Sequence, residues 1–297
     1  PTELKSSLTI AEEADKNYHR ENIIGEQLVG AGFSEIMNNS LTKSSYYEET
    51  GLNAYPWEET VKVMNPLSAD LGVMRQTLLF GGLESIVRNV NRKAQNLRFF
   101  EVGNVYKFNK EKWSEESPVK AYSQDYHMAL WVTGKRVQGS WAHPDEESTF
   151  YELKAYVENI LRRIGIAQGL LVSEKSDNNV FDKAIVLKTR AGKVLVEMGI
   201  LSHKLLKSFN IDQKVYYAEL DWAGLMKAIR KNKLQFQEIS KYPAVSRDLA
   251  LLVDNNVEFA QIEEIARQAD KKLLKRVELF DVYQGKNLPE GKKSYAV

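Results

Sequence analysis

The side chains that could carry catalysis or bind a metal are few and scattered. The sequence contains no cysteine and four histidines, His19, His127, His143 and His203. No two of these histidines have the H-x-x-x-H or H-x-x-E-H spacing that places two metal ligands on one helix face. The sequence also lacks G-x-S-x-G, a Walker-type glycine loop and G-x-G-x-x-G, so acyl transfer and phosphate binding have no local signature. We therefore expect no catalytic residue and no metal site in this chain.

Two adjacent glycines, Gly81 and Gly82, could form a phosphate-binding turn. No Lys, Ser or Thr is placed to meet a phosphate there, so a loop that leads into a helix explains them better. Arg88, Arg92 and Lys93 follow on the same predicted helix. Their spacing fits the solvated face of an amphipathic helix better than an RNA-binding edge.

The end of the sequence carries the strongest local charge. From residue 271 onward seven cations face three anions, a net charge of +4: Lys271, Lys272, Lys275, Arg276, Lys286, Lys292 and Lys293 against Glu278, Asp281 and Glu290. Phe280 and Tyr283 lie among them, and cations with aromatics can combine phosphate contacts with base stacking. Strand alternation places these two aromatics on opposite faces, so one of them belongs to a core. From the residues alone, RNA binding and a merely solvated basic edge are equally supported.

The elements that must position these residues follow from hydrophobic periodicity. Predicted helices cover 17–31, 77–93, 149–164, 202–209 and 222–233, and predicted strands cover 33–41, 61–64, 97–108, 126–133, 183–190, 194–201 and 215–220. The helix at 222–233 has a basic, polar end, and we place a domain boundary near Lys233.

The remaining residues predict a smaller unit. A strand at 247–253, a helix at 258–269, a strand at 274–283 and a strand from Lys292 follow in that order, and Ile262, Ile265 and Ala266 are expected to face inward. This order is the first part of a split β-α-β, ferredoxin-like unit, which needs a second helix and a fourth strand to finish. Because the sequence starts without methionine and stops within a predicted strand, we interpret it as a fragment.

Composition sets the outer limits. The 297 residues, 43% hydrophobic, suffice for two domains with separate cores. With 41 Lys and Arg against 40 Asp and Glu, the formal net charge is +1, so the whole chain has no field that would attract nucleic acid or membrane. Its apolar runs are far shorter than the roughly 20 residues of a membrane span. The absence of cysteine fits a cytoplasmic protein.

Several longer motifs carry a family resemblance. They are MNPLS at 64–68, VMRQTLL at 73–79, GLE at 82–84, FEVG at 100–103, FYELK at 150–154, YPAVSRDLA at 242–250, LFDVY at 279–283 and PEGKKS at 289–294. Together they closely resemble the bacterial phenylalanyl-tRNA synthetase beta chain, over nearly the whole sequence.

The resemblance implies an α+β fold. Residues 1–233 would form an antiparallel-sheet core of the class II aminoacyl-tRNA synthetase type, without its chemistry. Residues 234–297 would form a truncated ferredoxin-like α/β sandwich, the anticodon-binding domain. The run Arg98-Phe99-Phe100-Glu101 echoes an ATP-binding motif of active class II enzymes, but its spacing is R-x-x-E rather than R-x-E. We therefore interpret that run as a buried strand.

The same resemblance implies the partners. The chain would be the non-catalytic part of an α2β2 phenylalanine-tRNA ligase, with the alpha chain and a second beta chain as protein partners and tRNA-Phe as the RNA partner. No cofactor is expected in this fragment, whereas ATP and Mg²⁺ are expected for the holoenzyme. The alpha chain would perform the reaction.

Site residues follow from these expectations. The predicted tRNA contacts are Tyr242, Arg247, Tyr283, Lys286, Lys292 and Lys293, with a structural ion pair between Arg247 and Asp248 as an alternative. The predicted subunit-interface residues are Ile24, Leu28, Leu79, Leu83, Ile86 and Val90, for which a place in the internal core is an equal alternative.

Two other function classes remain open. The first is a class II-fold ligase or transferase with its own active site, such as a biotin-ligase-like enzyme, which would need a phosphate-binding arginine and an ATP pocket. The second is a ferredoxin-like regulatory module that binds a small ligand rather than RNA. Binding of ATP by this chain alone would favour the first, and salt-insensitive ligand binding without tRNA affinity would favour the second.

Overall fold

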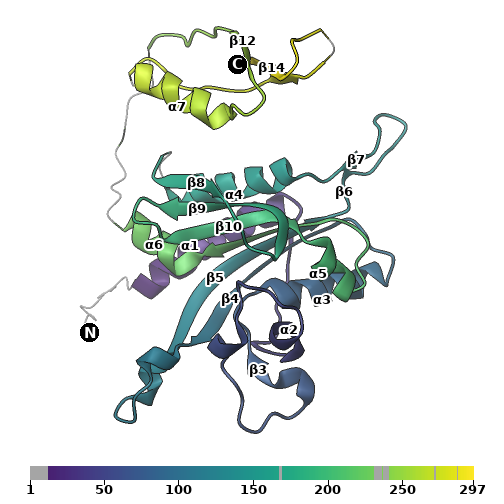
Figure 1. The fold of residues 1–297 in the computed structure, drawn as a ribbon, viewed down its shortest axis with the longest axis vertical. Helices are drawn as coiled ribbons and strands as arrows, with labels where there is room; N and C mark the ends of the chain where they lie inside the picture. Colours follow the sequence, from purple (N-terminus) through teal and green to yellow (C-terminus); the bar gives the residue numbers. More distant parts are fainter. Residues whose placement is uncertain (1–12, 167–168, 231–235, 237–240, 271, 286) are drawn as a thin grey trace, which may run out of the picture. The chain divides into compact units, whose positions relative to one another are not determined.

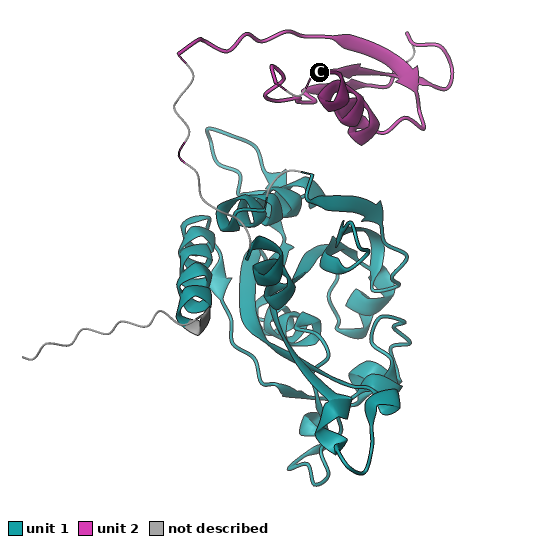
Figure 2. Ribbon diagram, turned by 90° about the vertical axis from the view of Figure 1, so that its left-hand side faces the viewer, with its two compact units in different colours: residues 1–233 teal, residues 234–297 magenta. Residues whose placement is uncertain are grey.

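The chain consists of two compact units, residues 1–233 and 234–297 (Figure 2). The computed structural model describes residues 13–166, 169–230, 236, 241–270, 272–285 and 287–297. None of the helices in these ranges combines the length and the apolar content needed to cross a membrane. Each unit is considered by itself below.

The first unit is built on a seven-stranded sheet with the strand order β1-β4-β5-β11-β10-β9-β8 (Figure 1). The strands are β1 (Ser34–Glu35), β4 (Leu97–Phe108), β5 (Tyr122–Thr133), β8 (Leu171–Lys175), β9 (Phe181–Thr189), β10 (Val194–Leu201) and β11 (Val215–Asp221). All neighbours are antiparallel except β1 and β4, which are parallel. The predicted antiparallel-sheet core is confirmed.

Helices cover both faces of this sheet. On one face, α1 (Glu13–Gly30), α4 (Phe150–Ile164) and α6 (Trp222–Ile229) pack over a core that includes Phe100 and Leu130. On the other face, α2 (Ser45–Glu48), α3 (Leu79–Val90) and α5 (His203–Ser208) pack over Phe99 and Trp131. Successive strand residues point to opposite faces, which is why Phe99 and Phe100 belong to different cores. Both faces of the sheet are therefore covered by helices of this unit.

Local signals fix the ends of several helices. Thr149 caps α4 by accepting a hydrogen bond from the Glu152 backbone N–H, and Gly165 ends this helix at φ 93°, a left-handed conformation that glycine adopts without strain. Ser202 and Asp221 cap α5 and α6 in the same way as Thr149. These features confirm the helices predicted at these positions. The predicted end of α6 at Lys233 lies outside the described residues.

The segments between these elements are shorter than predicted. The prediction of continuous strands at 33–41 and 61–64 is wrong. The first range contains β1 and the start of β2 (Leu41–Thr42), a two-residue strand that pairs with β3 (Val73–Met74). The second range contains a single bridge, from Lys62 to Val73. The described part of the unit also contains an antiparallel ribbon of β6 (Lys135–Val137) with β7 (Glu146–Glu147). It contains four 3₁₀ turns as well: η1 (Trp57–Glu59), η2 (Ala69–Leu71), η3 (Lys110–Lys112) and η4 (Pro118–Ala121). Strand β8 was not predicted, because four of its five residues are exposed and show no alternation.

The second unit has the β-α-β-β order that the sequence predicts. Its sheet has the order β12-β14-β13, all antiparallel, from β12 (Ala250–Asp254), β13 (Asp281–Tyr283) and β14 (Lys292–Ala296), with α7 (Phe259–Ala269) between β12 and β13. The strand predicted at 274–283 forms only at its end. Ile265, predicted to face inward, is 67% exposed, because α7 packs only a narrow stripe onto this small sheet.

Candidate functional site

A row of three glutamates crosses the sheet of the first unit on the face that α3 covers. Glu101 on β4 lies opposite Ala129, Ala129 lies opposite Glu219 on β11, and Glu219 lies opposite Glu197 on β10. Charged groups in a protein interior are costly unless hydrogen bonds or opposite charges compensate them. The partners of these three carboxylates therefore decide whether the row is a reactive site or a structural one.

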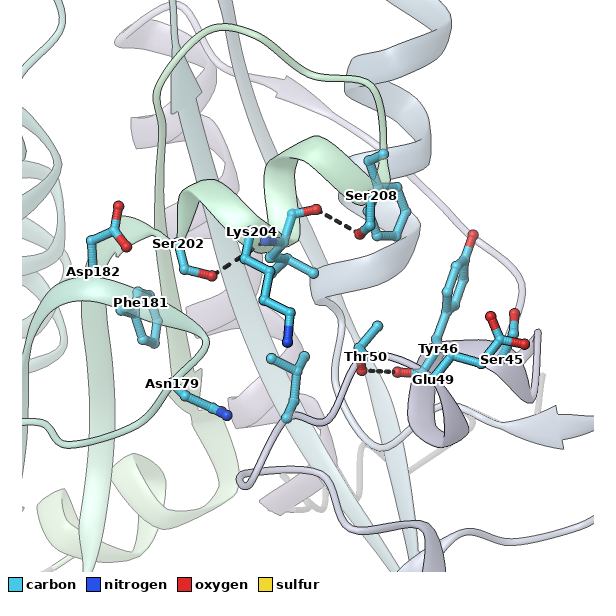
Figure 3. Close-up of a pocket in the computed structure, with 13 residues that line it drawn as sticks. Ser45, Tyr46, Glu49, Thr50, Asn179, Phe181, Asp182, Ser202, Lys204 and Ser208 are labelled. Atoms are coloured by element: carbon cyan, nitrogen blue, oxygen red, sulfur yellow. Dashed lines mark hydrogen bonds between the residues drawn. The ribbon is translucent and has the colours of Figure 1, made fainter.

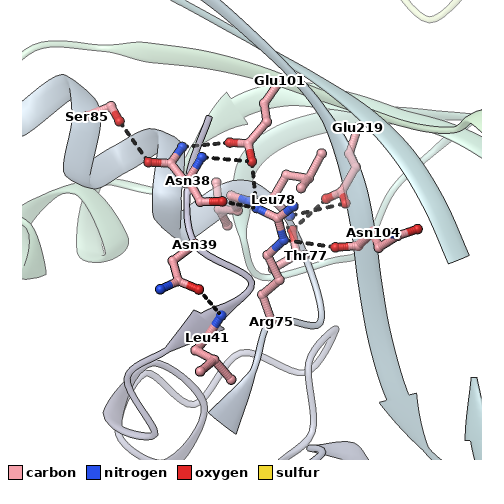
Figure 4. Close-up of polar contacts among 11 residues, drawn as sticks. Asn38, Asn39, Leu41, Arg75, Thr77, Leu78, Ser85, Glu101, Asn104 and Glu219 are labelled. Atoms are coloured by element: carbon pink, nitrogen blue, oxygen red, sulfur yellow. Dashed lines mark hydrogen bonds and ion pairs between the residues drawn. The ribbon is translucent and has the colours of Figure 1, made fainter. Parts of the chain in front are cut away.

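Glu101 is fully compensated by residues of this chain (Figure 4). Arg75 forms an ion pair with its Oε1 at 2.6 Å, and Asn38 Nδ2 donates to its Oε2 at 2.6 Å. Arg75 Nε also donates to the Asn104 carbonyl at 2.9 Å. A Cβ on Gly103 would lie 2.3 Å from the Arg75 guanidinium, so only glycine leaves room for this arginine. Arg75 is thus a buried structural partner of Glu101, not a cation available to a phosphate.

Glu219 is held by three side chains. His127 Nδ1 lies 2.8 Å from Oε1, while the Thr77 and Tyr217 hydroxyls each donate to Oε2 at 2.6 Å. Burial alone would raise the pKa of Glu219, but the hydrogen bonds and the charge of His127 outweigh it, and the pKa lies below its usual 4.5. Burial likewise lowers the pKa of His127, yet the hydrogen bond and charge of Glu219 raise it above 6.5. The two residues form an ion pair in the interior.

Glu197 has neutral partners. The Ser176 hydroxyl and Asn178 Nδ2 donate to its carboxylate, while burial is the largest effect and raises its pKa. Across the described residues, no three His, Asp or Glu side chains converge as a metal ion would require. The row acts as a polar network that ties the VMRQT segment to the sheet through Arg75 and Thr77.

Two cavities lie among the elements that pack on this face of the sheet. The larger, about 490 Å³, lies between α2 and α5, and the Lys204 amine points into it (Figure 3). Its Ser202 and Ser208 hydroxyls are used by α5 itself: Ser202 accepts from the Leu205 N–H and Ser208 donates to the Leu205 carbonyl. The smaller, about 220 Å³, is lined by Arg75, whose guanidinium Glu101 already binds. The Ser202 and Ser208 hydroxyls therefore serve the ends of α5 rather than act as nucleophiles.

The glycine pair and the arginine-bearing strand have structural roles. A Cβ on Gly82 would lie 2.1 Å from the Trp131 ring, and one on Gly81 would lie 2.8 Å from the Asn38 side chain. The predicted loop leading into a helix is wrong, because both glycines lie inside α3, where Asn38 and the Trp131 ring on the sheet leave no room for a side chain. Arg98 pairs with Glu152 on α4 at 3.1 Å, so the motif-like run is the structural strand β4.

The predicted interface residues lie inside the unit. Ile24, Leu28, Leu79, Leu83 and Ile86 are fully buried and Val90 is half-buried. Their apolar surface packs against the sheet of this same chain, so the internal-core alternative describes them. Any partner that contacts α1 or α3 would meet the outward faces of these helices.

The second unit brings two of the predicted RNA contacts onto one surface. Tyr283 lies opposite Ser294 and Lys292 lies opposite Asp254, so Tyr283 and Lys292 share the sheet face away from α7. Tyr283 is 44% exposed, and Lys292 forms an ion pair with Asp254 at 2.7 Å. This surface, which we call the open face, carries both an aromatic ring and a cation.

The other predicted RNA contacts lie elsewhere. Tyr242, 84% exposed, and Arg247 precede β12, where Arg247 donates to the Ser246 carbonyl at 3.0 Å. Lys286 lies outside the described residues. Lys293 is 8% exposed, donates to the Asn255 carbonyl at 3.0 Å and lies over the Tyr295 ring. Strand alternation directs Lys293 toward α7, so we no longer expect it to contact RNA.

The sequence did not predict the glutamate network. Its signal was a charged residue within an apolar strand, as at Glu101 between Phe100 and Val102 and at Glu219 between Ala218 and Leu220. The strand register that aligns these positions could not be read from the sequence.

Comparisons with known proteins cover both units. The family model described as "Phenylalanyl tRNA synthetase beta chain CLM domain" matches residues 1–222, and the one described as "Ferredoxin-fold anticodon binding domain" matches residues 240–297. The phenylalanine--tRNA ligase beta subunit of Bacteroides thetaiotaomicron is 58% identical over 297 residues, and that of Porphyromonas gingivalis is 50% identical over 294. The alignments cover 100% and 99% of this chain and 36% of each relative, so the chain spans about a third of their length.

A solved structure supports the fold. The pyrrolysyl-tRNA synthetase of Desulfitobacterium hafniense superposes with a TM-score of 0.51 at 16% identity, covering 72% of this chain and 69% of that one. At this identity the likeness shows the fold alone, which is that of a class II synthetase core. With two family models that together span nearly the whole sequence, the chain belongs to the phenylalanyl-tRNA synthetase beta chain family.

Proposed function

We propose that this chain is the non-catalytic C-terminal part of a phenylalanine-tRNA ligase beta chain. In this proposal the alpha chain joins phenylalanine to tRNA-Phe with ATP and Mg²⁺, in an α2β2 assembly, and the first unit supports the alpha chain. The observation that carries the proposal is the match of both units, in order, to the two family domains.

The engaged charges of the glutamate row support a non-catalytic role for the first unit. α3 packs against Trp131 and Tyr217, two large side chains that are fully buried on the face of the glutamate row. The Glu101 and Glu219 carboxylates are bound by Arg75 and His127 of the same chain. The cations beside the glutamate row, Arg75 and His127, are therefore engaged within the chain and are not available to the phosphates of ATP.

We propose that the second unit binds the tRNA anticodon stem-loop through its open face. Tyr283 would stack on an unpaired base. Lys292 would leave its ion pair with Asp254 and form one with an RNA phosphate. Tyr242 and Arg247 would add contacts from the segment before β12. The second unit would contribute to aminoacylation by positioning the tRNA, because the anticodon is far from the end of the tRNA that receives phenylalanine.

The main test uses full-length beta chain co-expressed with the alpha chain. Deleting residues 234–297 should weaken tRNA-Phe binding and slow aminoacylation, while the alpha and beta chains still associate. Unchanged tRNA affinity and unchanged charging after the deletion would refute the assignment of the second unit.

Single substitutions test the open face. Tyr283→Ala should weaken tRNA-Phe binding by roughly 1–3 kcal/mol, the usual loss for one stacked base. Lys292→Gln should weaken it and reduce the slope of log affinity against log salt by about 0.7–0.9. The matched control is Arg267→Gln, which removes a cation that Glu263 already pairs on α7. Equal effects of Lys292→Gln and Arg267→Gln would contradict a specific open-face contact.

A further inference from the structure

Two segments that are far apart in sequence concentrate positive charge on the first unit. They are residues 88–96, from the last turn of α3 to the start of β4, and residues 207–214, from the end of α5 to the start of β11. Their charged side chains are five cations and one carboxylate: Arg88, Arg92, Lys93, Lys207, Lys214 and Asp212. The net charge of the two segments is therefore five minus one, or +4, whereas the net charge of the whole chain is +1. We call the two segments together the basic corner.

Contacts hold the two segments side by side. The ring of Phe209, which follows α5, stacks on Phe80 of α3 with the ring centroids 6.2 Å apart. Further along, the Gln213 side chain donates to the Gln95 carbonyl at 2.8 Å and to the Thr133 hydroxyl at 2.7 Å. The second segment therefore runs along α3, from the first turn of this helix to the residues that follow its last turn, and α3 and α5 are neighbours in the fold (Figure 1).

The cations of the basic corner are not neutralised by the chain itself. All five are exposed, and their side chains form no ion pair or hydrogen bond with any residue that the structure describes. The adjoining ribbon of β6 and β7 differs, because Lys135 pairs with Asp145 at 2.6 Å and Arg136 lies 4.0 Å from Glu146. With two cations and three carboxylates, residues 134–148 add −1 and leave +3. Like charges that stay uncompensated repel one another, so this surface attracts an anionic partner.

The other side chains of the basic corner favour RNA over a protein as this partner. Residues 91–96 are all exposed and read Asn-Arg-Lys-Ala-Gln-Asn, and no large apolar side chain of the basic corner is exposed. The buried core of a protein interface is apolar and aromatic and is depleted in charged residues. Arg, Lys, Asn and Gln side chains are the groups that contact the phosphates and sugars of nucleic acids. The basic corner has the second composition and lacks the first.

We propose that the basic corner binds the sugar-phosphate backbone of tRNA, as a contact additional to the open face of the second unit. This proposal rests on the proposed function, because it takes tRNA-Phe as the ligand. The sequence favoured a solvated face for Arg88, Arg92 and Lys93 because it shows them as one short run, which Lys207 and Lys214 join only in the folded chain. Phosphate contacts carry no sequence information, so the basic corner strengthens and orients binding while recognition of the anticodon stays with the second unit.

The first test measures tRNA-Phe binding by full-length beta chain assembled with the alpha chain, over a series of salt concentrations. The corner variant combines Arg92→Gln, Lys93→Gln and Lys214→Gln. Because each phosphate contact contributes about 0.7–0.9 to the slope of log affinity against log salt, the slope should fall in magnitude by about 2. The three side chains have no partner among the described residues, so the urea midpoint should not change.

A matched control removes the same charge elsewhere. It combines Lys110→Gln, Lys112→Gln and Lys120→Gln, three exposed lysines in the loop between β4 and β5. Three glutamates in the same loop balance these lysines: Glu111, Glu115 and Glu116. The slope should change by less than about 0.5 in the control, because distant exposed charges are screened by salt. An unchanged slope in the corner variant, or an equal change in the control, overturns the proposal.

The second test identifies what covers the basic corner. Acetylation of Lys93 and Lys214 in the assembled enzyme, followed by peptide mass spectrometry, should become slower when tRNA-Phe is added, whereas acetylation of Lys110 should not. If Lys93 and Lys214 are already protected without tRNA, another part of the enzyme covers them. If their acetylation is the same with and without tRNA, no RNA contact exists. Either result overturns the proposal.

The experiments separate this proposal from the proposed function. If deletion of residues 234–297 leaves tRNA affinity and charging unchanged, the assignment of the second unit fails, whatever the corner variant does. If that deletion weakens tRNA binding and the corner variant binds tRNA-Phe with the salt dependence of the unsubstituted enzyme, only the role of the basic corner fails.

Discussion

Replacing His127 by alanine tests the ion pair within the glutamate network. The variant removes the cation 2.8 Å from Glu219 and leaves this buried carboxylate with the Thr77 and Tyr217 hydroxyls and, at 3.4 Å, the Leu78 N–H. Breaking a buried pair typically costs 3–5 kcal/mol. Because the His127 side chain is 21% exposed, we expect a value near the lower end, about 3 kcal/mol.

The loss of stability should depend on pH in a defined direction. Since the folded-state pKa of His127 is raised above 6.5, its contribution is complete below pH 6.5 and declines as pH rises through the folded pKa. Since the folded-state pKa of Glu219 lies below 4.5, its contribution is present above pH 4.5 and is lost as pH falls through the folded pKa. The difference between the unsubstituted chain and His127→Ala should therefore be largest between these two regions. At high pH neutral His127 can still donate one hydrogen bond, which leaves about 1 kcal/mol.

Urea unfolding of the 297-residue chain at pH 5.5 and pH 8.5 measures this difference. Tryptophan fluorescence is a suitable signal, because Trp131 and Trp222 are buried in the two cores of the first unit. His203→Ala, at an exposed position, serves as the control and should stay within about 0.5 kcal/mol of the unsubstituted chain. A difference for His127→Ala below about 1 kcal/mol at pH 5.5, or one that grows as pH rises, would refute the ion-pair description.

Two further stability predictions follow from the same unit. Gly82→Ala should destabilise it by about 1–3 kcal/mol, because the added methyl group overpacks the contact with Trp131. Gly30→Ala is the control and should be close to neutral, because its added Cβ has no heavy atom within 4 Å. Equal urea midpoints for the two variants would argue against the close approach of Gly82 to Trp131. Arg75→Ala should cost about 3–5 kcal/mol, because it leaves Glu101 buried without its cation. In that case thermal unfolding should show a Tm lowered by roughly 6–20 °C, and a Tm lowered by less than about 2 °C would mean that Asn38 alone compensates the carboxylate.

The sequence by itself determined the elements whose signals are local. The helix ending at Ile164 was readable from the i, i+3, i+4 repeat, the Thr149 cap and the Gly165 terminator, which act within a few residues. Long strands such as β4 and the order of elements in the second unit were also predictable, because hydrophobic periodicity and turn residues are local signals. The family was readable because its motifs are contiguous stretches of sequence.

Only the tertiary structure decided which side chains meet. The alignment of Glu101, Glu219 and Glu197 depends on the register of strands far apart in sequence. The burial of Lys293 follows from where β14 places it relative to α7, so its charge alone suggested the wrong surface. Helical periodicity marks an apolar face without saying what covers it, and packing assigned Ile24 and Leu83 to the core.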